Sequence, residues 1–255
     1  VYTFWLTDRT VMYTRVRSTT MGAELTWNPV LTVATDALAY DVFVDDDGVI
    51  HVAYIQQSPL ESQPAGIYYR SKPVSRVWTS PVAVYTSDYF RNMRASQAYI
   101  NIAAGELLKD SGEESDIEKH LFVAWNDPLQ YNSMVSSTVD GSKVWTEPAE
   151  IDPTVLVTDS TSLAPSLAIW NNQALLVWKK ELSETTCEIR YKVSSDGQSW
   201  QETGVQFTSM NGCPEDSGFV MQDDAHVLWH GIFNDQVVLT AWNGKQWSEP
   251  RTELD

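Results

Sequence analysis

One sequence pattern recurs five times along the chain and restricts the folds that it can adopt. In each copy a tryptophan follows a stretch of turn-forming residues and begins a short final run. These tryptophans are Trp27, Trp78, Trp145, Trp200 and Trp247. Successive copies lie about 50 residues apart, which is within the range of the larger repeat architectures. The chain is therefore expected to consist of five similar repeats.

A second series of aromatic residues supports the same division. In every repeat an aromatic residue lies in an apolar run about 20 residues before the tryptophan of the first series. The members of this series are Trp5, Tyr54, Trp125, Trp178 and Trp229. Two independent positions thus repeat in the same order and at similar spacing.

Each repeat contains short apolar runs separated by turn residues. The fourth repeat has SLAIW, ALLVW, CEIRYKVSS and SWQETGVQF, with NNQ, a polar loop and DGQ between them. Such runs, joined by Asn or Asp-Gly turns, predict antiparallel strands connected by hairpins. The only segment with a tolerable match to a helical period is IAAGELL near Ile102, in an insertion of the third repeat.

Four-stranded sheets repeated at this period are typical of the blades of a β-propeller. We predict an all-β propeller of about five four-stranded antiparallel blades in a single domain. The expected blades are residues 1–34, 35–86, 87–153, 154–208 and 209–255.

The first repeat is one strand short. Residues 1–34 supply three runs, YTFWL, TVMYTRVRS and WNPVLTV, and the innermost strand is missing. The chain ends after a fourth strand, so no later strand is left to complete the first blade. Because an open sheet edge exposes unpaired backbone groups, we expect a domain of a longer polypeptide, with the missing strand or further blades outside these residues.

The turn before the last strand carries a motif in three repeats. It reads TVDGSKVW at 138–145, SSDGQSW at 194–200 and WNGKQW at 242–247. A glycine accepts the positive φ of a tight turn, an acidic or amide side chain accepts hydrogen bonds from the turn amides, and the tryptophan anchors the turn.

These turns resemble the Asp-box, or BNR repeat, of the sialidase-like propeller superfamily, whose pattern is roughly Ser-x-Asp-x-Gly-x-x-Trp. The matching positions are Asp140, Gly141, Trp145, Asp196, Gly197, Trp200, Asn243, Gly244 and Trp247. In that superfamily the boxes lie on the side of the propeller away from the catalytic centre. The resemblance therefore implies a structural role for them.

The charge of the chain excludes some partners. A formal net charge of −17, from 34 acidic and 17 basic residues, disfavours nucleic acid and anionic membrane surfaces, which attract clustered Lys and Arg. No apolar run is long enough to span a bilayer. Cys187 and Cys213 leave two alternatives open, one disulfide or two free thiols.

The resemblance suggests that the chain could have exo-sialidase activity. An exo-sialidase holds the carboxylate of its substrate with three arginines. The chain has nine arginines, and only Arg91 and Arg94 are expected near the axis, so an arginine triad is not expected. A second resemblance is to five-bladed glycosidases that use paired carboxylates, through WNDP at 125–128. That stretch, however, is expected to end a second strand of a middle blade.

We predict a non-catalytic propeller that binds a protein or glycan, or serves as a scaffold, within a larger protein with flanking domains. The alternative is a glycoside hydrolase of exo-sialidase or five-bladed carboxylate type. An extracellular or cell-surface setting is expected. The residues expected on the axial face, where a ligand would bind, are Tyr89, Arg91, Arg94, Asp127, Glu215 and Asp216.

No cofactor is expected. The acidic run DDDG places Asp45, Asp46 and Asp47 in one loop, and carboxylates in a loop can hold calcium. The spacing is not that of a calcium-binding loop, and a turn between two strands explains the run. The polar stretch 109–119 is expected to be a solvated insertion, with a partner-binding loop as the lesser alternative.

Overall fold

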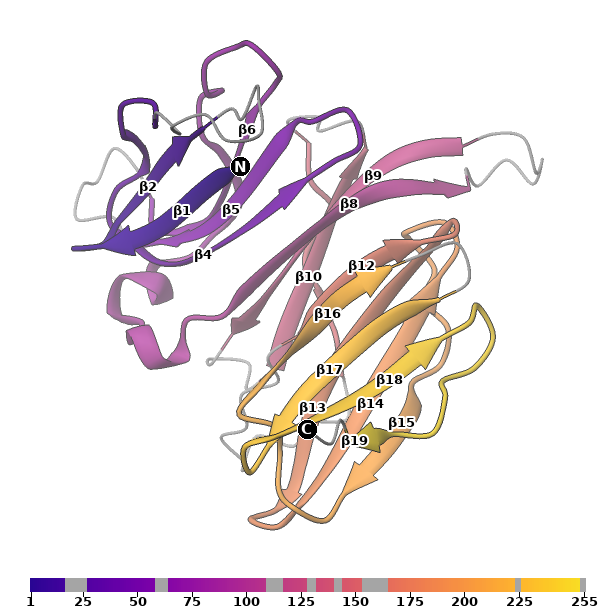
Figure 1. The fold of residues 1–255 in the computed structure, drawn as a ribbon. Coiled ribbons are helices and arrows are strands. Elements are labelled where there is room, and N and C mark those ends of the chain that lie inside the picture. Colours follow the sequence, from indigo (N-terminus) through magenta and orange to yellow (C-terminus); the bar gives the residue numbers. More distant parts are fainter. Residues whose placement is uncertain are drawn as a thin grey trace. The chain divides into compact units, whose positions relative to one another are not determined.

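The structure is a computed structural model that describes residues 1–16, 27–57, 64–108, 117–127, 132–139, 144–152, 165–222 and 226–252. Its regular structure is almost entirely β-strand, arranged in five antiparallel sheets (Figure 1). The chain divides into an N-terminal unit, Val1–Ile100, and a C-terminal unit, Asn101–Asp255. Each unit is described by itself.

The N-terminal unit contains two sheets. The first is β1 (Tyr2–Thr7), β2 (Thr10–Arg15) and β3 (Leu31–Ala34). The second is β4 (Ala37–Val44), β5 (Ile50–Gln56), β6 (Gly66–Lys72) and β7 (Val82–Thr86). Two short 3-10 helices follow, η1 (Asp88–Asn92) and η2 (Ala95–Gln97).

The core of this unit lies between its two sheets. Val11 and Tyr13 of β2 pack against Val52 and Tyr54 of β5. β5 is buried at every position, which explains its continuous apolar sequence, since a strand covered on both faces needs no alternation.

The C-terminal unit contains three four-stranded sheets, each paired in chain order. The first is β8 (Ile100–Leu108), β9 (Ile117–Asp127), β10 (Asn132–Val139) and β11 (Ala149–Glu150). The second is β12 (Ser166–Trp170), β13 (Gln173–Ser183), β14 (Thr186–Ser194) and β15 (Gly204–Ser209). The third is β16 (Asp216–Gln222), β17 (Val227–Phe233), β18 (Gln236–Trp242) and β19 (Arg251–Thr252).

The sheets of this unit pack face to face through large side chains. Phe122 of β9 and Trp178 of β13 belong to one core cluster. Trp229 of β17 packs with Ile189 of β14 in another. Three aromatic residues of the second sequence series, Trp125, Trp178 and Trp229, are thus buried on the second strand of each sheet in this unit.

The predicted fold class is confirmed. The sheets have three, four, four, four and four antiparallel strands, as in a five-bladed propeller whose first blade has three strands. The predicted single domain stays a prediction. In the part of the chain that the structure describes, no helix is long and apolar enough to cross a membrane.

The expectation of a helical period in IAAGELL is wrong, because this segment forms most of β8. Ile102, Ala103 and Leu107 are all buried. A strand that is buried on both faces loses the alternation that marks a strand in sequence. At Gly105 an added Cβ would lie 2.7 Å from Ile169, so the small residues of the run let the next sheet approach.

Candidate functional site

A row of polar groups lies at the starts of the first strands of the three C-terminal sheets. The Asn101 side-chain oxygen on β8 accepts a hydrogen bond from the Leu167 backbone N–H on β12, 2.7 Å away. The Ser166 hydroxyl donates to the Ser217 carbonyl of β16 at 3.5 Å. β12 and β16 lie side by side (Figure 1). We call Asn101, Ser166, Asp216 and Ser217 the polar row.

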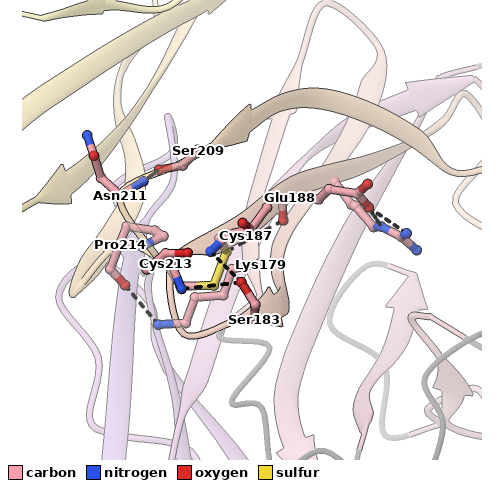
Figure 2. Close-up of a disulfide and its surroundings, with 11 residues drawn as sticks. Lys179, Ser183, Cys187, Glu188, Ser209, Asn211, Cys213 and Pro214 are labelled. Carbon is pink, nitrogen blue, oxygen red and sulfur yellow. Dashed lines mark hydrogen bonds and ion pairs between the residues drawn. A yellow bond between two sulfur atoms is a disulfide. The ribbon is translucent and has the colours of Figure 1, made fainter.

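A lysine from a second strand lies beside this row. The Lys179 ammonium on β13 donates to the Pro214 carbonyl at 2.9 Å (Figure 2), two residues before Asp216. Burial lowers the pKa of Lys179, and the nearby carboxylates of Asp216 and Glu181 act in the opposite direction. A partly desolvated cation therefore lies close to the carboxylate of the polar row.

A disulfide fixes the loop that carries these groups. Cys187, at the start of β14, is bonded to Cys213 in the loop between β15 and β16 (Figure 2). Cys187 is fully buried in the core cluster of Ile189 and Trp229. Of the two alternatives that the sequence left open, the bridged one is correct. The bridge holds Pro214 against β13 and so helps to place Asp216.

The three predicted axial-face residues of the C-terminal unit occupy different environments. Asp216 begins β16 and its side chain accepts the Ser217 N–H at 2.8 Å, and Glu215 donates its N–H to the Ile232 carbonyl. Both side chains are exposed. Asp127 ends β9, as the sequence indicated, but is only 6% exposed. Asp127 is therefore mostly withdrawn from solvent.

The other three predicted axial-face residues lie in the N-terminal unit, around η1 and η2. Tyr89 and Arg91 are in η1, and the Arg91 guanidinium pairs with Asp88 at 2.9 Å. Arg94 directly precedes η2, and its backbone N–H donates to the Gln97 side-chain oxygen at 3.4 Å. The fully buried Phe90 anchors the segment. The six predicted ligand-binding residues thus form two groups, with three residues in each unit.

One carboxylate of the acidic turn between β4 and β5, that of Asp45, stabilises the turn itself. Asp45 accepts the Val49 N–H at 2.8 Å and lies 3.1 Å from the His51 ring nitrogen Nε2. The other ring nitrogen, Nδ1, lies 2.8 Å from the Tyr69 hydroxyl. Asp46 and Asp47 are exposed. Among the described residues, no group of three or more His, Cys, Asp and Glu could hold a metal ion.

The turn at 194–200 has the hydrogen bonds that its sequence suggests. One Asp196 carboxylate oxygen accepts the backbone N–H groups of Gln198 and Ser199, at 2.8 and 2.7 Å. The Ser194 hydroxyl donates to that oxygen at 3.1 Å and accepts the Gly197 N–H at 2.9 Å. Burial alone would raise the pKa of Asp196, but these hydrogen bonds outweigh it and lower the pKa.

The turn at 242–247 repeats this arrangement with an amide. The Asn243 side-chain oxygen accepts the N–H groups of Lys245 and Gln246, both at 3.0 Å. Trp242 and Trp247 form a bridge across the turn. Trp145 of the third motif is half-buried; its partners Asp140 and Gly141 lie outside the described residues.

Two of the arginines on third strands have structural partners. Arg190 pairs with the fully buried Asp152 at 3.0 Å and with Glu188 at 2.6 Å. Asp152 also accepts the Trp178 indole N–H at 3.3 Å. Arg70 donates to the Thr79 and Val33 carbonyls. These guanidinium groups join neighbouring strands, sheets and turns.

Sequence reasoning missed Asn101, Ser166 and Lys179. The available signal was positional. Asn101 and Ser166 are polar residues at the starts of predicted first strands, and Lys179 follows the apolar run ALLVW. Only the alignment of neighbouring sheets brings them to one place.

No protein-family model matches the sequence, and neither does any curated protein. Among solved structures, an exo-1,5-alpha-L-arabinanase from a bovine ruminal metagenomic library is similar to this chain, with a TM-score of 0.51 and 12% identity. That match covers 98% of this chain and 95% of the arabinanase.

Two further similar structures have lower scores. An alpha-L-arabinofuranosidase from Fusarium graminearum has a TM-score of 0.49 and 11% identity, over 86% of this chain. A family 117 glycoside hydrolase from the marine bacterium Zobellia galactanivorans has a TM-score of 0.45 and 10% identity, over 81% of this chain. This chain spans 66% of each of these two proteins.

At these identities the similarity concerns the fold, which is that of five-bladed propeller glycoside hydrolases. The propeller predicted from the five repeats is thereby confirmed. Assignment to the sialidase-like superfamily stays a prediction.

Proposed function

We propose that this chain is a carbohydrate-active propeller that binds a neutral oligosaccharide at the polar row. The observation that carries the proposal is the exposed Asp216 carboxylate with the Lys179 ammonium beside it. Asn101 and the buried Ser166 join the neighbouring first strands and so fix the position of this pair. A carboxylate accepts hydrogen bonds from sugar hydroxyls, and an ammonium group donates to them.

The charge of the chain supports a neutral sugar over an acidic one. An anionic sugar needs a positive cluster, for which arginine is the usual donor. With a net charge of −17, the chain repels anions at long range. Arg70 and Arg190 are used in structural contacts. These properties disfavour the exo-sialidase alternative.

Hydrolysis by paired carboxylates is the first candidate activity. It is supported by the fold shared with an exo-1,5-alpha-L-arabinanase. Such a reaction needs two carboxyl groups on opposite sides of the scissile bond. Asp216 is our candidate for one of them.

Binding without hydrolysis is the second candidate. Glu215 and Asp216 are adjacent at the start of β16, and successive side chains of an extended segment point to opposite faces. These two carboxylates therefore do not form the pair that hydrolysis needs, and Asp127 is buried. This arrangement favours a binding module.

The test is calorimetric titration with 1,5-alpha-L-arabino-oligosaccharides, together with an assay of released reducing sugar. We expect Asp216→Asn to weaken binding by about tenfold, or about 1.4 kcal/mol, because it removes a charged acceptor. Glu215→Gln is the matched control and should change binding by less than about twofold. Release of sugar by the wild type, abolished in Asp216→Asn, would identify a hydrolase; binding without release would identify a binding module.

An acidic oligogalacturonide serves as the comparison ligand. It should bind more weakly than the neutral ligand at low salt, because of the negative field of the chain. Tighter binding of the acidic ligand, no binding of any neutral oligosaccharide tried, or equal effects of the two substitutions would each contradict the proposal.

We also propose an extracellular or cell-surface setting. The Cys187–Cys213 disulfide supports it, because disulfides persist mainly in oxidising compartments.

A further inference from the structure

A second carboxylate lies on the same strand as Lys179. Glu181 follows Lys179 by two residues in β13 and is exposed. Side chains two residues apart in a strand point to one face of the sheet. Glu181 and Lys179 therefore project from the same face of β13, and Lys180 between them projects from the opposite face.

The residues paired with these two show which way this face points. Lys179 and Glu181 lie opposite Ile189 and Cys187 of β14, and directly paired residues share a face of the sheet. Ile189 and Cys187 pack in the core cluster that contains Trp229 of β17. The face that carries Lys179 and Glu181 is thus the one that packs against the third sheet of the C-terminal unit.

Two contacts anchor the loop before β16 at this face. Cys187, directly opposite Glu181, is bonded to Cys213. The next residue, Pro214, accepts the hydrogen bond from the Lys179 ammonium at 2.9 Å (Figure 2). The loop is therefore held beside both charged residues of β13, and it leads directly into the start of β16.

The Lys179 ammonium interacts with carboxylates from two sheets. Burial lowers the pKa of Lys179, and Asp216 of β16 and Glu181 of β13 both act in the opposite direction. An ammonium group has three donors, of which Pro214 accepts one. A ligand at this place would meet one partly buried donor group and an acceptor from each of the two sheets.

We infer that Glu181 is a second ligand-binding residue of the site and that it selects neutral over acidic sugars. The inference rests on the proposed function, the binding of a neutral oligosaccharide beside Asp216. Each carboxylate accepts hydrogen bonds from sugar hydroxyls, and the Lys179 ammonium donates to a sugar oxygen. The sugar is thus held from β13 and from β16.

The selection follows from the charges at the site. A ligand carboxylate bound here would lie near two negative side chains, Asp216 and Glu181, and only one positive side chain, Lys179. Like charges repel at close range, and specificity arises from such repulsion as well as from attraction. A neutral sugar meets no repulsion of this kind.

The test is calorimetric titration of wild type, Glu181→Gln and Glu184→Gln with the neutral 1,5-alpha-L-arabino-oligosaccharide and with the acidic oligogalacturonide. Glutamine keeps the length of the side chain and removes its charge. Glu184 is exposed in the turn between β13 and β14. Glu184→Gln therefore changes the net charge equally, three residues away, and is the matched control.

We expect Glu181→Gln to weaken binding of the neutral ligand by about fivefold, because a charged acceptor is lost. The preference for the neutral over the acidic ligand should fall by about tenfold, because the repulsion is also lost. Glu184→Gln should change both quantities by less than about twofold.

A measurement without ligand checks the arrangement of the three charges. NMR titration of the Lys179 side chain should give a lower pKa in Glu181→Gln than in wild type, because a carboxylate that raises this pKa is removed. The pKa of Lys179 should not change in Glu184→Gln. Thermal melts check that both variants fold.

Three results would overturn this inference alone: neutral binding that Asp216→Asn weakens and Glu181→Gln does not, equal effects of the two glutamine variants, or a pKa of Lys179 that is the same in Glu181→Gln and wild type. Failure of the wild type to bind any neutral oligosaccharide would overturn the proposed function, and the role of Glu181 with it.

Discussion

At the scale of single residues, two turns show which atoms the Asp-box sequence requires. Asp196 and Asn243 each accept two backbone N–H groups through one side-chain oxygen. The shared requirement is an acceptor at that position, followed by a glycine with positive φ. Asp196 also carries a negative charge, which Asn243 does not.

The two glycines of these turns should differ in their response to alanine. Gly197 and Gly244 both have positive φ, which costs an L residue about 1 kcal/mol. A Cβ on Gly197 would also lie 2.8 Å from His120 Nδ1 and 2.9 Å from Phe122, whereas one on Gly244 would have its nearest contact at 3.7 Å. We expect Gly197→Ala to lower the free energy of unfolding by about 2–4 kcal/mol and Gly244→Ala by about 1 kcal/mol.

Urea unfolding of the two variants and the wild type measures these losses. Equal losses would mean that the surroundings of Gly197 relax, and that backbone strain alone sets the cost.

The charge of Asp196 should appear as a dependence of stability on pH. Its pKa is lower in the folded chain than the ordinary value of 3.8. The stabilisation is therefore complete above about pH 4 and is lost as the pH falls through the folded-state pKa. Asp196→Asn keeps the acceptor but does not titrate, so the stability of the wild type relative to this variant should fall in acid.

Thermal melts of wild type and Asp196→Asn between about pH 7 and pH 2.5 test this linkage. A difference in Tm that stays constant over that range would contradict it.

At the scale of strands and loops, the disulfide connects β14 to the loop after β15, which no hairpin bond holds. Hairpin bonds join β13 to β14 and β14 to β15. The loop after β15 is held by Cys213 to Cys187 and by Pro214 to Lys179. This loop precedes Asp216, so the same contacts that stabilise it also position the polar row.

Loss of the disulfide should therefore destabilise the chain. The bond closes a segment with a sequence separation of 26, for which the chain-entropy model gives about 3.5 kcal/mol. We expect the double variant Cys187→Ala, Cys213→Ala to lose about this much in urea unfolding. A reductant should lower the stability of the wild type only, since the double variant has no bond to reduce; an equal shift in both would contradict this.

At the scale of the whole molecule, charge and repeat architecture have separate consequences. The net charge of −17 concerns partners and underlies the expected preference for a neutral over an acidic oligosaccharide. The repeat architecture concerns stability, because neighbouring sheets within each unit bury faces against one another. Titration with oligosaccharides therefore tests the function independently of the fold.

Much of the fold could be predicted because its signals are local. Strand runs, Asn and Asp-Gly turns and the aromatic series are encoded within a few residues of one another, and they gave five sheets and the short first blade. β8 was harder, because burial on both faces removes the alternation that identifies a strand.

The ligand-binding role of the six predicted site residues stays a prediction. Glu215 and Asp216 follow from their place before a first strand, and both lie there exposed. Asp127 was expected on the same face, and the structure places it at the end of β9 with 6% of its surface exposed.

The amino-acid sequence by itself determined the number of repeats, the strand pattern and the hydrogen-bonding turns, because hairpin formation depends on neighbouring residues. The tertiary structure decided which distant residues meet: Cys187 with Cys213, Lys179 with Pro214, Asn101 with Leu167, and His51 with Asp45 and Tyr69. These contacts depend on strand register and on the packing of one sheet against the next, which no local pattern specifies.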